Sequence, residues 1–101
     1  MFALVVRFDL KDEVSAEKFD ALVAETGEGI RAHETGTLVY ATHAVEGEPL
    51  ARIFYELYAD RAAFDAHEQQ PHVVRFLEER KLYTQDVRVE FLSVGPSKGI
   101  G

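Results

Sequence analysis

The chain has 101 residues, no cysteine and a formal net charge of -7 at neutral pH. This length accommodates one domain, because two cores of ordinary size need more residues. The lack of cysteine excludes disulfides, thiolate metal sites and cysteine nucleophiles. The negative charge, with basic residues scattered singly, argues against nucleic-acid binding and against adhesion to anionic membranes. No apolar run has membrane-spanning or signal-segment character, so we expect a cytoplasmic protein.

The first part of the chain predicts a strand and a long helix. Residues 2–8 are β-branched and aromatic with apolar side chains on both faces, which is typical of a strand in the middle of a sheet. Ser15 suits a helix N-cap, and apolar residues follow it at helical spacing. Gly27 and Gly29 each cost about 1 kcal/mol in a helix interior. The helix therefore loosens there, or a strand packs closely against it, before Gly36 marks its end.

The second part predicts a hairpin, two short helices and a last strand. Two alternating stretches flank a turn that contains Gly47 and Pro49. Asp60 is a good N-cap, and Pro71 suits the first turn of the helix that follows. The predicted strands cover residues 37–45, 50–59 and 86–94, the helices cover residues 60–68 and 71–82, and a flexible tail covers residues 96–101.

The order of these elements is β-α-β-β-α-β, which predicts an α+β protein with a ferredoxin-like sandwich over residues 1–95. Two helical segments cover only one face of a four-stranded sheet. The first and third strands nevertheless carry apolar side chains on both faces. Because no further element remains to cover the second face, we expect a homodimer that packs through the open sheet face.

Glu56 is the carboxylate best suited to chemistry, because it shares a strand face with Phe54 and Tyr58. Facing an apolar interior, its pKa would be raised and it would be a plausible base. Near a sheet edge, it would instead meet water or pair with Arg52 or Arg88. The sequence leaves both interpretations open.

His67 lies one turn after Phe64 and should face inward from its helix. One interpretation is that His67 has a functional role. The others are that it is a core histidine with a local hydrogen bond, or that it interacts with the dipole at the helix end. His67 and His72 are separated by Pro71 and lack the spacing of zinc-chelating pairs, so no metal site is predicted. No glycine-rich phosphate loop or dinucleotide fingerprint supports flavin or nicotinamide binding.

The run that begins at Glu56 and Tyr58 and continues through Asp60, Phe64 and His67 to Pro71-His72 resembles the antibiotic biosynthesis monooxygenase family, especially its small quinol-monooxygenase-like members. The likeness extends over nearly the whole chain. It implies a dimeric α+β barrel with a pocket between sheet and helices. It also implies oxidation of a phenolic or quinol-like molecule by O₂ without flavin, haem or metal. A base removes the phenolic proton, and the anion passes an electron to O₂.

The same resemblance implies roles for individual residues. His67 or Glu56 would be the base, with Tyr58 and His72 as orienting or donor groups. Haem-degrading members use Asn, Trp and His, and this chain has neither Asn nor Trp, so haem degradation is not expected. Two alternatives are a non-catalytic small-molecule-binding dimer and an isomerase that uses the same bases. The aromatic residues expected to bind a small aromatic substrate are Phe54, Tyr40, Phe64, Phe76 and Tyr83.

Overall fold

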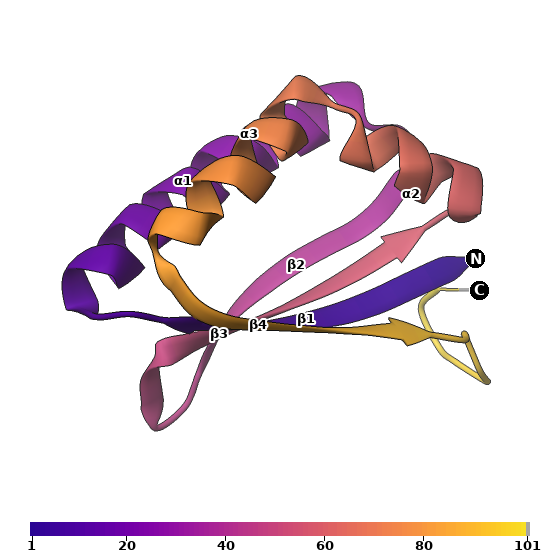
Figure 1. The fold of residues 1–101 in the computed structure, drawn as a ribbon. Coiled ribbons are helices and arrows are strands. Elements are labelled where there is room, and N and C mark those ends of the chain that lie inside the picture. The colour runs from indigo at the N-terminus through magenta and orange to yellow at the C-terminus, as the bar shows by residue number, and fades with distance from the viewer. Residues whose placement is uncertain (101) are drawn as a thin grey trace.

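The computed structural model describes residues 1–100, which contain four strands, three α-helices and one 3-10 helix. The strands form one antiparallel sheet in the order β2-β3-β1-β4. The helices all lie on one face of this sheet (Figure 1). The predicted ferredoxin-like α+β fold is therefore confirmed. The elements are β1 (Phe2–Leu10), α1 (Glu13–His33), β2 (Thr37–Val45), β3 (Glu48–Tyr58), α2 (Arg61–Glu68), α3 (Pro71–Glu79), the 3-10 helix η1 (Arg80–Leu82) and β4 (Thr84–Leu92).

Helix caps explain where the helices begin. The prediction of Ser15 as N-cap was wrong, because Oδ1 of Asp12 accepts a hydrogen bond from the backbone nitrogen of Ser15 at 2.7 Å. Ser15 thus lies inside the first turn of α1. Asp60 caps α2 as predicted, with its Oδ1 accepting from the backbone nitrogen of Ala63 at 2.8 Å. Pro71 is the first residue of α3, where its missing N–H costs no helical hydrogen bond.

The core between sheet and helices is largely aromatic. Phe8 lies near the centre, with its ring centroid 5.0 Å from that of Phe19 and 4.7 Å from that of Phe54. Phe76 of α3 completes the cluster. In the register of β1 and β3, Glu56 lies opposite Leu4, two residues along the strand from Phe54. The strand therefore carries this carboxylate on the helix-facing side of the sheet.

Gly29 allows α1 and α3 to approach closely. Helix α1 continues without interruption through both of its glycines, so the predicted loosening does not occur. A Cβ added at Gly29 would lie 2.5 Å from the ring of His72, which fills the space that a side chain would need. The predicted close neighbour is thus a side chain of α3 rather than a strand.

Alanine substitutions at the two glycines of α1 should have opposite effects on stability. Gly27→Ala should stabilise the protein by up to about 1 kcal/mol, because alanine favours helix and an added Cβ meets only the Arg31 guanidinium at 3.7 Å. Gly29→Ala should destabilise it, because the His72 ring must move. Urea denaturation of both variants measures the difference. Equal stabilisation by the two substitutions would contradict the close contact.

The sheet face away from the helices carries apolar side chains of the central strands, including the half-buried Val5, Ile53 and Tyr55. At one end, residues 93–97 and Ile100 share a shallow hollow with Ala3 and Tyr55. The predicted flexibility of residues 96–101 stays a prediction, and Gly101 lies outside the described residues. Within residues 1–100, no helix combines the length and apolar character needed to cross a membrane.

Candidate active site

Helix α2 brings two inward side chains to the sheet. Phe64 and His67 are three residues apart and both are buried, as expected for neighbours on one helix face. The helix lies close to the loop before β2, where a Cβ added at Gly36 would be 2.6 Å from that of Ala63. The backbone nitrogen of Ala59 also donates to the carbonyl of Gly36 at 2.9 Å. These contacts hold the end of α1 beside α2.

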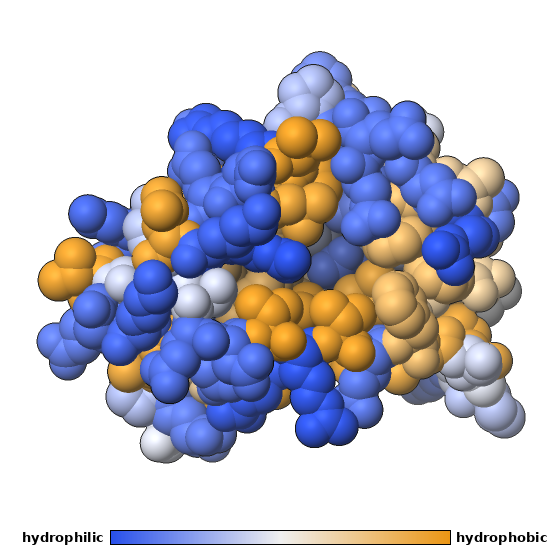
Figure 2. Space-filling view, viewed as in Figure 1, coloured by the Kyte–Doolittle hydropathy of each residue, from blue (hydrophilic) through white to orange (hydrophobic). Residues whose placement is uncertain are grey.

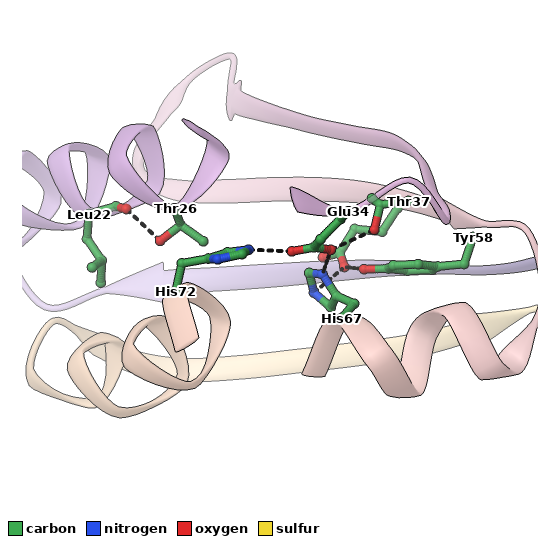
Figure 3. Close-up of polar contacts among 8 residues, drawn as sticks. Leu22, Thr26, Glu34, Thr37, Tyr58, His67 and His72 are labelled. Atoms are coloured by element: carbon green, nitrogen blue, oxygen red, sulfur yellow. Dashed lines mark hydrogen bonds and ion pairs between the residues drawn. The ribbon is translucent and has the colours of Figure 1, made fainter. Parts of the chain in front are cut away.

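Glu34, the C-cap residue of α1, is the centre of a polar cluster (Figure 3). Its Oε1 accepts a hydrogen bond from the Thr37 hydroxyl at 2.7 Å and lies 2.6 Å from Nδ1 of His67. Its Oε2 lies 2.5 Å from Nε2 of His72. The Glu34 side chain is only 4% exposed. One buried carboxylate therefore joins three side chains from β2, α2 and α3.

The charge of Glu34 determines the orientation of His67. Burial would raise the pKa of Glu34, but hydrogen bonds from Thr37, His67 and His72 outweigh it and lower the pKa below the ordinary value. An ionised carboxylate only accepts hydrogen bonds. A neutral His67 consequently carries its proton on Nδ1, and Nε2 keeps a free lone pair. Nε2 is 3.8 Å from Oε1 of Glu56. The Glu34–His67 pair is thus arranged as an oriented general base.

Glu56 is buried, as one of the two interpretations of the sequence required. Burial raises its pKa, although the hydrogen bond from Tyr58 and the nearby His67 act in the opposite direction. The Tyr58 hydroxyl donates to Oε1 of Glu56 at 2.5 Å. Burial is the main cause that raises the pKa of the Tyr58 phenol, and the charge of Glu56 adds to it. The hydroxyl therefore keeps its proton and remains a donor. Glu56 is therefore held in place as a second group able to exchange a proton.

A cavity of about 130 Å³ lies between the sheet and helices α2 and α3. It opens beside β4, where Val89 and Phe91 are 44% and 62% exposed. Figure 2 shows a hollow on this face, with hydrophobic side chains above and below it. Its walls are mainly apolar, as ligand sites usually are. The polar residues that line it are Thr26, Tyr40, Glu56, His67, Glu68 and Arg80.

The structure brings together only part of the predicted site. Glu56 and His67 line the cavity, as do the aromatic residues Tyr40, Phe64 and Phe76. The other four predicted residues are not among those that line it. Tyr58 and Phe54 are fully buried, at 0% and 1% exposure. His72 contacts Oε2 of Glu34, and Tyr83 packs against the core.

The sequence reasoning missed Glu34, Thr37 and Arg80. The only signal for the first two was their position between the end of the predicted helix and the next strand. The charge run Glu78-Glu79-Arg80-Lys81 predicts a solvated face. The guanidinium carbon of Arg80 instead lies 5.9 Å from the centroid of the Phe8 ring, at the cavity wall.

Within residues 1–100, no group of three or more His, Cys, Asp or Glu side chains is placed to hold a metal ion. The ring nitrogens that face Glu34 are engaged in hydrogen bonds to it. The expectation that the protein uses no cofactor stays a prediction.

Replacing Glu56 with glutamine should stabilise the protein at neutral pH. Folding raises the pKa of Glu56 above 4.5, so the stability it contributes is complete below pH 4.5 and is lost as the pH rises through the raised pKa. Glutamine keeps an acceptor for the Tyr58 hydroxyl without the buried charge. Tm should thus be higher in Glu56→Gln at pH 7, and the advantage should shrink towards pH 4. A lower Tm at pH 7 would contradict this assignment.

Comparisons with known proteins agree with the fold. A model of the antibiotic biosynthesis monooxygenase family matches residues 1–79. The comparison with curated proteins found no match. A solved structure described as an antibiotic biosynthesis monooxygenase is 25% identical, with a TM-score of 0.85 and coverage of 95% of this chain and 100% of that one.

Two further solved structures come from named bacteria. A protein of Bacteroides thetaiotaomicron that is also described as an antibiotic biosynthesis monooxygenase is 26% identical to this chain. The TM-score is 0.83, and the match covers 99% of this chain and 93% of that one. One from Caulobacter crescentus is 19% identical, with a TM-score of 0.86 and coverage of 94% and 90%. At that identity, the likeness concerns the fold alone.

Proposed function

Because this chain belongs to the antibiotic biosynthesis monooxygenase family, we propose that it is a cofactor-independent monooxygenase that oxidises a phenolic or quinol-like small molecule with O₂. The observation that carries the proposal is the Glu34–His67 pair, whose free Nε2 lies at the wall of a largely apolar cavity. An oriented imidazole of this kind is suited to removing a phenolic proton. The apolar walls exclude water from the anion that forms.

The reaction balances without an added reductant. His67 takes the proton from one hydroxyl of a quinol, and the anion passes an electron to O₂. Recombination forms a C–O bond at a ring carbon, and the resulting hydroperoxide loses water. Quinol and O₂ thus give a hydroxyquinone and one water, with the substrate supplying all four electrons. In this proposal Glu56, whose Oε1 is 3.8 Å from Nε2 of His67, returns a proton to the oxygen that leaves as water.

Oxygen consumption tests this function directly. Single-ring quinols, naphthols and anthrones should be incubated with the protein in air, with an oxygen electrode recording uptake and mass spectrometry recording incorporation of ¹⁸O₂. We expect one O₂ consumed per substrate molecule and one labelled oxygen atom in the product. Ligands that raise Tm without any oxygen uptake would overturn the proposal and favour a non-catalytic binding protein.

An isomerase is a second candidate, favoured by the two proton-exchanging groups on one cavity wall. Nε2 of His67 and Oε1 of Glu56 lie 3.8 Å apart, so one could remove a proton and the other return it elsewhere on the same molecule. Such a reaction proceeds without O₂. Substrate conversion in a nitrogen atmosphere, with solvent deuterium entering the product, would identify this activity and exclude the oxidation.

We also propose that two copies pair through the open sheet face. Val5, Ile53 and Tyr55 lie on the central strands of that face, where no helix covers them (Figure 1). Light scattering should give a mass about twice the 11.4 kDa of one chain. Ile53→Asp should shift the mass to that of a monomer, whereas Val74→Asp, at an exposed position of α3, should not. A monomer of the unmodified protein at micromolar concentration would contradict the pairing.

A further inference from the structure

Arg80 projects from η1 into the wall of the same cavity that His67 and Glu56 line. Its guanidinium carbon lies 5.9 Å from the centroid of the Phe8 ring, a distance at which the cation is attracted to the aromatic face. The residue is half buried. Arginine remains charged under these conditions, so the cavity contains a fixed positive charge as well as a base.

This guanidinium has no anionic partner among the residues that the structure describes. Five other arginines form ion pairs within 4 Å of carboxylates, whereas no carboxylate of residues 1–100 lies that close to Arg80. Burial lowers the pKa of Arg80, with Glu68 and Glu56 acting against that effect from a distance. A partly desolvated cation with spare donors is stabilised by a ligand that supplies a carboxylate, since the planar guanidinium matches it in a bidentate contact. The paired arginines are Arg7, Arg52, Arg61, Arg75 and Arg88.

The cation and the base reach the cavity at different positions along β1. His67 and Glu56 lie near Leu4, which pairs with Glu56 in the sheet. Arg80 lies over Phe8, which is four residues beyond Leu4 in the same strand. The backbone positions of Leu4 and Phe8 are therefore about 13 Å apart. A ligand that contacts both ends must therefore carry its two polar groups on opposite sides of an apolar body.

The size of the cavity limits that body to one ring. An engineered apolar cavity of about 150 Å³ in another protein accommodates benzene, and the cavity here has about 130 Å³. The walls around this space include the aromatic side chains of Phe64 and Phe76. A single aromatic ring therefore fills the enclosed part, and a fused ring system would have to extend out beside β4.

We propose that the substrate is a single-ring phenol with a carboxylate on the side of the ring away from the reacting hydroxyl, and that Arg80 binds this carboxylate. The phenolic end of this assignment rests on the proposed function, whereas the carboxylate end rests on Arg80 alone. Arg80 selects the substrate and fixes its direction, so that the hydroxyl meets His67. The net charge of -7 repels anions in general, which makes this one cation decisive for an acidic ligand.

Binding measured without O₂ tests the carboxylate assignment separately from any reaction. The probes are 4-hydroxybenzoate and 4-hydroxybenzamide, which have similar size and differ in charge. NMR titration should give a dissociation constant about tenfold or more lower for the acid, as expected for a charged hydrogen-bonded contact. Arg80→Gln should remove the preference, and Arg80→Lys should retain part of it. Arg31→Gln, at an exposed position of α1, should leave it unchanged.

The two proposals fail in different ways. Equal affinity for the two probes, or a preference that persists in Arg80→Gln, would overturn the carboxylate assignment. The thermal melting curve of Arg80→Gln checks that the variant is folded. A clear preference for the acid, together with no oxygen uptake from any hydroxylated acid, would support the Arg80 site while refuting the monooxygenase.

Discussion

Replacing His67 with glutamine should lower kcat by about 10²- to 10⁴-fold, the usual contribution of a positioned general base. Glutamine keeps a polar group near Glu34 but cannot take up a proton at neutral pH. Nδ1 of His67 lies 2.6 Å from Glu34, and His67 is the one histidine of residues 1–100 that lines the cavity. Steady-state oxygen uptake measures the loss.

A matched histidine separates this effect from a general one. His43 lies exposed on β2, where its Nδ1 contacts the carbonyl of Ile53, and His43→Gln should leave kcat unchanged. The melting temperatures of both variants establish that each is folded. A fall of less than threefold in His67→Gln, with the protein folded, would show that His67 is not the base and would move that role to Glu56.

Glu34→Ala should produce the largest loss of stability of any single substitution considered for this chain. It leaves Thr37, His67 and His72 without their common acceptor. Leaving a buried polar group without its hydrogen-bond partner costs about 1–3 kcal/mol for each group, so the three losses together should lower Tm by more than about 10 °C for a chain of this length. Activity should fall as well, because the His67 ring loses the group that orients it.

The pH dependence of this effect has a definite sign. Folding lowers the pKa of Glu34 below 4.5, so the stability contributed by its ionised form is present above pH 4.5 and is lost as the pH falls through the lowered pKa. The difference between the unmodified protein and the variant should thus be largest near neutral pH and shrink in acid. Urea denaturation from pH 7 to pH 3 measures it.

Two variants keep this prediction testable. If Glu34→Ala does not fold, Glu34→Gln retains the shape of the side chain and should show a smaller loss with the same pH trend. Glu28→Ala removes an exposed carboxylate from the same helix and should change stability by less than about 0.5 kcal/mol. A Glu34 variant as stable as the Glu28 variant at pH 7 would refute the role of Glu34 as the centre of the cluster.

The sequence by itself determined the fold and named Glu56 and His67 as candidates, but it left open whether Glu56 faces the interior. Alternating apolar residues, the N-cap at Asp60 and the proline at the first position of α3 are local signals, and each acts through contacts within a few residues. They were sufficient to predict a ferredoxin-like order of elements. The same alternation placed Glu56 and Phe54 on one strand face, and helical spacing placed Phe64 and His67 on one helix face.

Only the tertiary structure decided which residues orient that site. Glu34 meets His67 and His72 across 33 and 38 residues of chain, and no local pattern specifies an approach of that kind. The contact depends on Gly29 and Gly36, whose missing side chains leave space for the His72 ring and for Ala63. Hydrogen bonds from Thr37, His67 and His72 then lower the pKa of Glu34 against the effect of burial, whereas burial raises the pKa of Glu56. Packing between distant elements, rather than local propensity, thus orients His67.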